Sequence, residues 1–154
     1  MHGYEKCYYT GTLGFIWTIV YKSMEKRYIK RTDLLRIIEV GAGQCQHFRF
    51  IKHKFSHNLA MDIRPYLFSD YNDSRIEIKF ADASNLEFVQ DGSYDRLIAT
   101  CLLAHLDKAR EALNEWERVI KKGGALTIYA PPEPGFLVRV VRKLFKWPKQ
   151  KNMD

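Results

Sequence analysis

Three carboxylic acids stand at the ends of three successive apolar runs of the sequence. Glu39 precedes the turn Gly41-Ala42-Gly43, Asp62 follows that turn by 19 positions, and Asp82 lies further along between two alanines. A carboxylate accepts hydrogen bonds from hydroxyl, amino and ammonium groups, and an acid about 20 residues after a glycine turn is placed to meet a ribose diol. Either aspartate alone would more often belong to a turn or a cap. Three acids at the ends of three successive strands are harder to explain in this way, and they indicate a ligand site.

The glycine turn itself stands where a strand is expected to pass into a helix. Glycines at such a junction let the backbone approach a ligand, and the helix start supplies free N–H donors. The dinucleotide fingerprint would need glycine or alanine at position 46, where this chain has Gln46, so a nicotinamide or flavin cofactor is disfavoured. The alternative for so short a motif is a tight turn that only packs a helix on a strand.

The elements that must position these residues alternate between strands and helices. Strands are expected over Leu34–Val40, Asn58–Ile63, Arg75–Phe80, Tyr94–Thr100 and Ala125–Ala130, and helices over Gln44–Lys54, from Pro65, and from the N-cap Asp107 to about Ile120, with Lys121–Gly124 as the helix stop. Right-handed crossovers between such units build a parallel sheet with helices on both faces. The pattern therefore predicts an α/β fold, a Rossmann-like doubly wound parallel sheet.

The charge is distributed unevenly along the chain. The net charge of +7 divides into +4 for residues 1–31, +5 for residues 136–154 and −2 for the residues between them. We expect a helical or lid segment over residues 1–33, with a helix from about Gly14 to Ile29, a core over residues 34–134, and a basic amphipathic helix and tail over residues 135–154. A polyanion or a membrane surface would therefore meet the two ends.

Composition also narrows location and partners. The cysteines Cys7, Cys45 and Cys101 are odd in number and far apart, which predicts reduced thiols, and no stretch has the length of a membrane span or the form of a signal peptide, so we expect a cytoplasmic protein. Peripheral membrane contact through the basic ends stays open. Single-stranded nucleic acid is disfavoured because the aromatic residues fall mostly on apolar stripes.

Six ordered motifs between Leu34 and Pro134 resemble those of the class I S-adenosylmethionine-dependent methyltransferases, in particular the small-molecule, type 11-like branch. They are Glu39-Val40-Gly41-Ala42-Gly43, Met61-Asp62-Ile63, Phe80-Ala81-Asp82-Ala83, Asp91-Gly92-Ser93-Tyr94-Asp95, Leu103-Ala104-His105-Leu106 and the stretch from Glu115 to Gly124. Each motif is short, and their order and spacing make the resemblance specific. The sheet of that family has two further strands, so the resemblance implies a sheet shortened at the C-terminus, through truncation or with its edge covered by the basic helix or a partner.

The resemblance implies S-adenosylmethionine as cofactor and a role for each matching residue. Its amino-acid end would be held by Glu39, Gly41, Ala42 and Gly43, its ribose by Asp62 with Ile63, its adenine by Asp82 and Ala83, and its methionine end would rest on Thr100. Cys45 stands where the family often has a third glycine. His105 would be a general base for a substrate hydroxyl or would only orient a loop, and His47, His53 and His57 are expected to be surface or packing residues rather than a metal set.

The resemblance further implies methyl transfer to a small-molecule, saccharide or lipid acceptor by direct displacement. Two alternatives stay open. The first is a truncated or non-catalytic cofactor-binding domain that acts as a partner or regulatory subunit. The second, an NAD-dependent oxidoreductase, is disfavoured by Gln46.

Overall fold

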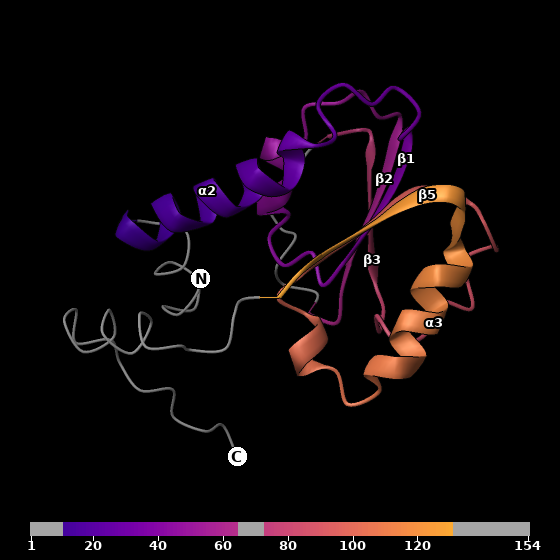
Figure 1. Ribbon diagram of the computed structural model, residues 1–154. Helices are drawn as coiled ribbons and strands as arrows, with labels where there is room; N and C mark the ends of the chain where they lie inside the picture. Colours follow the sequence, from indigo (N-terminus) through magenta and orange to yellow (C-terminus); the bar gives the residue numbers. More distant parts are fainter. Residues whose placement is uncertain (1–10, 65–72, 131–154) are drawn as a thin grey trace, which may run out of the picture.

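The structure, a computed structural model, describes residues 11–64 and 73–130 (Figure 1). Its elements are α2 (Gly11–Lys26), β1 (Arg36–Val40), the 3₁₀ helix η1 (Gln46–Phe50), β2 (His57–Asp62), β3 (Ile76–Phe80), β4 (Tyr94–Thr100), the 3₁₀ helix η3 (Leu103–His105), α3 (Ala109–Val119) and β5 (Ile120–Tyr129). The helices expected from Pro65 and within residues 135–154, and Cys7, lie outside the described residues.

The five described strands form one parallel sheet in the order β3-β2-β1-β4-β5. β1 therefore lies between β2 and β4, and the direction in which the chain adds strands reverses at β1. Open α/β sheets bind ligands at such a reversal, outside the carboxyl ends of the strands. The predicted α/β, Rossmann-like fold is confirmed, and its carboxyl edge is the place to look for a site.

The two faces of the sheet have different interiors. On the α3 face, Trp116 packs with Ile38 and Leu97 in an apolar core. On the other face lie α2 and η1, and there Ile37 and Ile98 pack against Phe48. Figure 1 shows α2 and α3 on opposite sides of the sheet. Because neighbouring strand residues point to opposite faces, Glu39 lies on the α2 and η1 face, like Ile37.

The helix expected over Gln44–Lys54 is wrong in length and type. The chain forms only the 3₁₀ helix η1 over Gln46–Phe50. Gly43 and Cys45 both have positive φ, 54° and 55°, and a left-handed residue cannot belong to a right-handed helix. Ile51 is already extended, which ends the helix after one short segment. The spacing of apolar residues over Gln44–Lys54 indicates a helix, but it does not reveal the left-handed backbone at Gly43 and Cys45.

The chain around α3 also departs from expectation. Lys108, not Asp107, occupies the N-cap position, and Ala109 begins the helix. The helix ends at Val119 as expected, but β5 begins at once at Ile120, where Lys121–Gly124 form an irregularity in its pairing with β4. A Cβ on Gly124 would lie 2.8 Å from the carbonyl oxygen of Asp95, so this close approach of β5 to β4 requires glycine.

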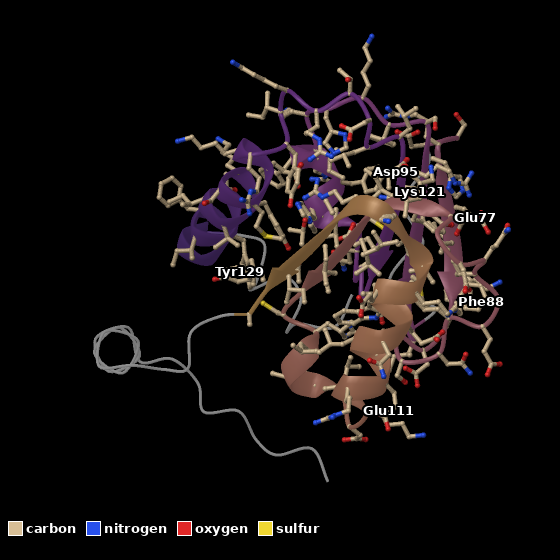
Figure 2. All side chains as sticks on the ribbon, turned by 45° about the vertical axis from the view of Figure 1, so that its right-hand side comes forward. Glu77, Phe88, Asp95, Glu111, Lys121 and Tyr129 are labelled. Carbon is tan, nitrogen blue, oxygen red and sulfur yellow. The ribbon has the colours of Figure 1, made fainter. Side chains whose placement is uncertain are left out.

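The first helix is shifted toward the N-terminus, and the opposite end of the sheet is tied together by polar contacts. α2 spans Gly11–Lys26 rather than Gly14–Ile29. At the amino ends of β1 and β4, Asp95 accepts hydrogen bonds from the backbone N–H groups of Leu35 and Arg36 and from Lys121 Nζ at 2.6 Å. Figure 2 shows Asp95 and Lys121 at one end of β5 and Tyr129 at the other. Within residues 11–64 and 73–130, no helix is long and apolar enough to cross a bilayer.

Candidate functional site

A cleft of about 1240 Å³ opens at the carboxyl ends of β1, β2 and β4. Its lining includes all ten residues predicted for the site, namely Glu39, Gly41, Ala42, Gly43, Asp62, Ile63, Asp82, Ala83, Thr100 and His105. These residues come from four strands and the segments that follow them. Residues that are scattered over the sequence therefore meet in one cavity, at the edge where the topology predicts a ligand.

Gly41 lets the first turn pass close to the β4 side of the cleft. Its φ is +64°, and a Cβ at this position would lie 2.9 Å from Leu102 Cδ1. The turn is held to β2 by the hydrogen bond from the Ala42 N–H to the Met61 carbonyl, 2.9 Å long. Cys45, which replaces the third glycine of the family pattern, takes the same left-handed conformation as a glycine, and burial raises the pKa of its thiol to about 12. A cysteine thus holds a backbone conformation that glycine adopts more readily.

Asp62 is buried at the floor of the cleft and connects two of its walls. It accepts a hydrogen bond of 3.1 Å from the backbone N–H of Gly43 in the first turn. Arg64 donates to the same carboxylate through its backbone N–H at 3.1 Å and its Nε at 3.0 Å. Sequence reasoning missed Arg64, although the spacing D-x-R was visible and recurs at Asp73 and Arg75, where the same contacts form. A ribose at Asp62 would have to share the carboxylate with this guanidinium.

Asp82 lines the cleft and also has the role of an ordinary turn residue. Its Oδ1 accepts from the backbone N–H of Ser84 at 2.8 Å and from the Ser84 hydroxyl at 2.7 Å. The first of these bonds, with smaller help from the second, lowers the pKa of Asp82. The next residue, Ala83, is buried, and its carbonyl accepts from the indole N–H of Trp116. The segment is thereby fixed to α3, with an ionised carboxylate toward the cleft.

Glu39 is the most deeply buried acid of the cleft, with 2% of its surface exposed. Burial raises the pKa of Glu39 to about 7, against the weaker opposing effects of His47 and Arg96. Its Oε2 has no hydrogen-bond partner among the described residues, and its Oε1 lies 3.7 Å from His47 Nδ1. A buried carboxylate oxygen without a partner costs free energy and suits a bound cationic group.

Two histidines that were expected on the surface or in simple packing belong to a buried polar network. His47 and His53 are 1% and 4% exposed, and they do not share a helix as expected, since η1 ends at Phe50. His47 Nε2 lies 2.9 Å from Glu25 Oε1, and His53 Nε2 lies 3.2 Å from an amino nitrogen of Arg96. His57, by contrast, is half-buried beside Glu77. In the described part of the chain, no three His, Cys, Asp or Glu side chains are arranged as a metal site.

The β4 side of the cleft carries Thr100 and His105. The hydroxyl of Thr100 is buried without a hydrogen-bond partner among the described residues. His105 is exposed on η3, whose backbone closes through the bond from the His105 N–H to the Leu102 carbonyl. Both residues line the cleft, and it stays a prediction that Thr100 lies at the methionine end of the cofactor and that His105 faces the acceptor.

Two aromatic residues of α2 complete the wall on this side. Trp17 and Tyr21 line the cleft, and their rings stack with centroids 5.6 Å apart. Tyr21 stacks in turn on the imidazole of His47 at 4.9 Å, and Trp17 makes an edge contact with Tyr129. The first helix therefore contributes to the lining of the cleft.

The cleft is acidic although the protein as a whole is basic. Among the described residues, seven acids line the cleft, and the basic side chains in the same lining are those of Arg64 and Lys108. The acids are Glu39, Asp62, Asp82, Glu87, Asp107, Glu111 and Glu115. Such a lining attracts cations and disfavours free anions. It agrees with a ligand that carries positive charge.

The fold and this cleft define a parallel α/β domain of the kind that binds a nucleoside-containing cofactor. The methyltransferase domain family matches residues 38–128 of the sequence, and the chain belongs to this family. Comparison with curated proteins gives no match. The predicted membership of the class I S-adenosylmethionine-dependent methyltransferases is thus confirmed, and S-adenosylmethionine is the cofactor of this domain.

Solved structures with the same fold include methyltransferases of low sequence identity to this chain. One is a candidate S-adenosylmethionine-dependent methyltransferase of Methanococcus maripaludis (20% identity, TM-score 0.65, covering 84% of this chain and 66% of the other). Another is a candidate histamine N-methyltransferase of Thermotoga maritima (23%, 0.61, 80% and 57%), and a third is the methyltransferase in complex with an activator protein of Haloferax volcanii (17%, 0.59, 71% and 55%). The chain therefore spans between about half and two thirds of their lengths.

The residues of the cleft fit this cofactor. S-adenosylmethionine has a sulfonium, an ammonium, a ribose diol and an adenine amino group, all of which suit carboxylates. Glu39 offers a buried oxygen without a partner, and the glycine turn leaves a cradle that a side chain at Gly41 would narrow.

Proposed function

We propose that this domain transfers the methyl group of S-adenosylmethionine to a small-molecule, saccharide or lipid acceptor. The observation that supports the proposal is the assembly of all ten predicted residues around one acidic cleft. The bound cofactor supplies a sulfonium, from which the methyl group passes to the acceptor atom while the sulfur keeps the electron pair of the broken bond.

In this proposal, the residues of the cleft bind the cofactor and orient it toward the acceptor. Glu39 and the turn at Gly41–Gly43 hold the amino-acid end, Asp62 with Ile63 holds the ribose, and Asp82 with Ala83 holds the adenine. Since a sulfonium is already a good leaving group, alignment of the acceptor with the methyl group supplies much of the rate. The residues around Thr100 then form the wall of the cleft next to the methionine end of the cofactor.

The acceptor would lie on the β4 side, between the cofactor and α2. Trp17 and Tyr21 offer aromatic faces there, and His105 is within the same lining. We propose that His105 removes the proton of an acceptor hydroxyl, because a neutral imidazole carries a ring nitrogen that can accept it. If it serves only as a wall, its replacement changes little.

Activity is tested by incubating the chain with S-adenosylmethionine and separate pools of phenols, amines, saccharides and lipids, and by measuring S-adenosylhomocysteine. With an accepted pool, His105→Ala is expected to leave S-adenosylhomocysteine affinity within about twofold and to lower turnover by about 10²-fold or more. His57→Ala, on the half-buried side chain beside Glu77, is the control. A large loss of cofactor affinity in His105→Ala would place this residue in the cofactor site instead.

A second candidate is a non-catalytic cofactor-binding domain that acts as a partner or regulatory subunit. Arg64 already engages the carboxylate of Asp62, which favours a weakened cofactor site. A structure of this fold is known in complex with an activator protein, so assembly with a protein partner is compatible with the fold. The two candidates differ in whether S-adenosylhomocysteine accumulates with any acceptor pool.

We also propose a cytoplasmic location, which the free thiols of Cys45 and Cys101 support. We further propose peripheral contact with anionic membranes, which one face of α2 supports. Phe15 and Ile19 on that face are 65% and 52% exposed, near the exposed Lys22. Exposed apolar residues beside basic ones suit a membrane surface. Co-sedimentation with anionic vesicles, and its loss with neutral ones, is the test.

A further inference from the structure

A chain of buried polar side chains runs from the cofactor cleft to the first helix. It begins at Glu39 on β1, continues through His47 on η1 to Glu25 on α2, and ends at Arg96 on β4. Arg96 is completely buried and binds both oxygens of Glu25, at 2.6 and 3.0 Å. The cleft is thus connected with α2 through groups that can carry protons.

The hydrogen-bond geometry limits how many protons these four side chains can carry. The guanidinium of Arg96 stays protonated, and Glu25 is ionised because the hydrogen bonds of His47 and Arg96 lower its pKa against the opposing effect of burial. A neutral imidazole has one N–H, which His47 Nε2 gives to Glu25 Oε1. Its Nδ1 then faces Glu39 as an acceptor, and two acceptors that face each other repel unless a proton lies between them.

We propose that Glu39 is protonated in the ligand-free domain, with His47 Nδ1 facing its carboxyl group at 3.7 Å, and that binding of the amino-acid end of S-adenosylmethionine expels this proton to solvent. The inference rests on the proposed function, which places the ammonium of the cofactor at Glu39. The ammonium takes over the role of the proton, because it brings a positive charge to the same carboxylate. His47 is then a positioning residue that sets the charge of Glu39.

Among the residues that the structure describes, the other titratable groups around Glu39 and His47 are already engaged, lie further off or carry negative charge. Glu25 faces His47 from α2, Arg96 and His53 stand behind it, and the thiol of Cys45 and the carboxylate of Asp62 are the remaining titratable groups on the cleft side. Arg96 is already engaged by Glu25, and burial keeps Cys45 protonated. The ring of Tyr21 covers the imidazole.

The direction of the pH effect follows from the site. Burial raises the pKa of Glu39 to about 7, so below that pH Glu39 holds its proton and binding must release it. The affinity for S-adenosylhomocysteine, which keeps the ammonium, should therefore rise with pH, by up to about tenfold per unit below the pKa and not above it. Proton release per bound ligand should approach one at about pH 5.5 and fall toward zero near pH 8.

The experiment is calorimetric titration of the full chain with S-adenosylhomocysteine in pairs of buffers that differ in ionisation enthalpy. The buffer dependence of the heat counts the protons released, and it is measured on the unaltered protein. Glu39→Gln should bind without proton release. His47→Gln, which keeps a donor for Glu25 but removes the imidazole nitrogen that faces Glu39, should shift the pH range of proton release and change the affinity at pH 7 by about three- to tenfold, with the two proteins converging at higher pH.

His57→Gln is the matched control, because it also removes an imidazole paired with a glutamate, at the other end of β2. It should release protons as the unaltered chain does. Binding without proton release, or a pH profile of His47→Gln that coincides with that of the unaltered chain, would overturn the inference and leave the proposed function standing. No binding by the folded chain at any pH would overturn both.

Discussion

Two aspartates of this chain show how one local arrangement acquires different chemistry. Asp62 and Asp73 are each followed two residues later by an arginine, and in both pairs the backbone N–H and the Nε of the arginine bond one carboxylate oxygen. Asp73 lies before β3, at the amino edge of the sheet, whereas Asp62 is buried in the cleft and also receives the N–H of Gly43. Position in the fold, and not the motif, makes Asp62 a candidate for the ribose.

Asp62→Ala is expected to weaken S-adenosylhomocysteine binding by at least about tenfold, or about 1.4 kcal/mol, the loss of a charge-assisted hydrogen bond. Asp73→Ala removes the same local pair outside the cleft and should leave affinity unchanged. Dissociation constants of both variants, measured by calorimetry with folding checked by circular dichroism, test this. Equal affinities of Asp62→Ala and the unaltered chain would rule out the ribose assignment.

At the scale of elements, α2 is attached to the sheet by charge as well as by apolar packing. The guanidinium of Arg96 also donates to Thr127 on β5 and stacks on the ring of Tyr28, 3.8 Å from its centroid. Together with Glu25, these contacts join α2 and the segment after it to β4 and β5. We therefore propose that α2 is a fixed wall of the cleft, held in place by the buried ion pair between Glu25 and Arg96.

Arg96→Met should lower the free energy of unfolding by about 3–5 kcal/mol, because it leaves the buried carboxylate of Glu25 without its cation. Adding Glu25→Leu should restore part of the loss, since the unpaired carboxylate of Glu25 is then removed as well. Arg36→Met, on an exposed arginine that also stacks on a tyrosine ring, should cost less than about 1 kcal/mol. Urea unfolding measures all three, and a loss in Arg96→Met no larger than that in Arg36→Met would contradict the account.

For the whole molecule, the sequence predicted the strands and the cleft better than the interior of the α2 face. Period-2 and helical spacing located all five strands, and family spacing located Glu39, Asp62 and Asp82, because these depend on local order along the chain. The partner of Arg96 is 71 positions away, and nothing in the strand pattern of Tyr94–Thr100 distinguishes a buried arginine from an exposed one. Likewise, the left-handed Cys45 that shortens η1 follows from backbone geometry that side-chain type does not reveal.

The central claim is that the acidic cleft binds S-adenosylmethionine. Calorimetric titration of the full chain with S-adenosylhomocysteine at neutral pH, with NAD as the comparison ligand, tests it most directly. The account predicts micromolar binding of S-adenosylhomocysteine and none of NAD, because the acids at Glu39 and Asp62 suit an ammonium and a ribose while Gln46 disfavours a dinucleotide. A folded chain that does not bind S-adenosylhomocysteine, or that binds NAD instead, would contradict it.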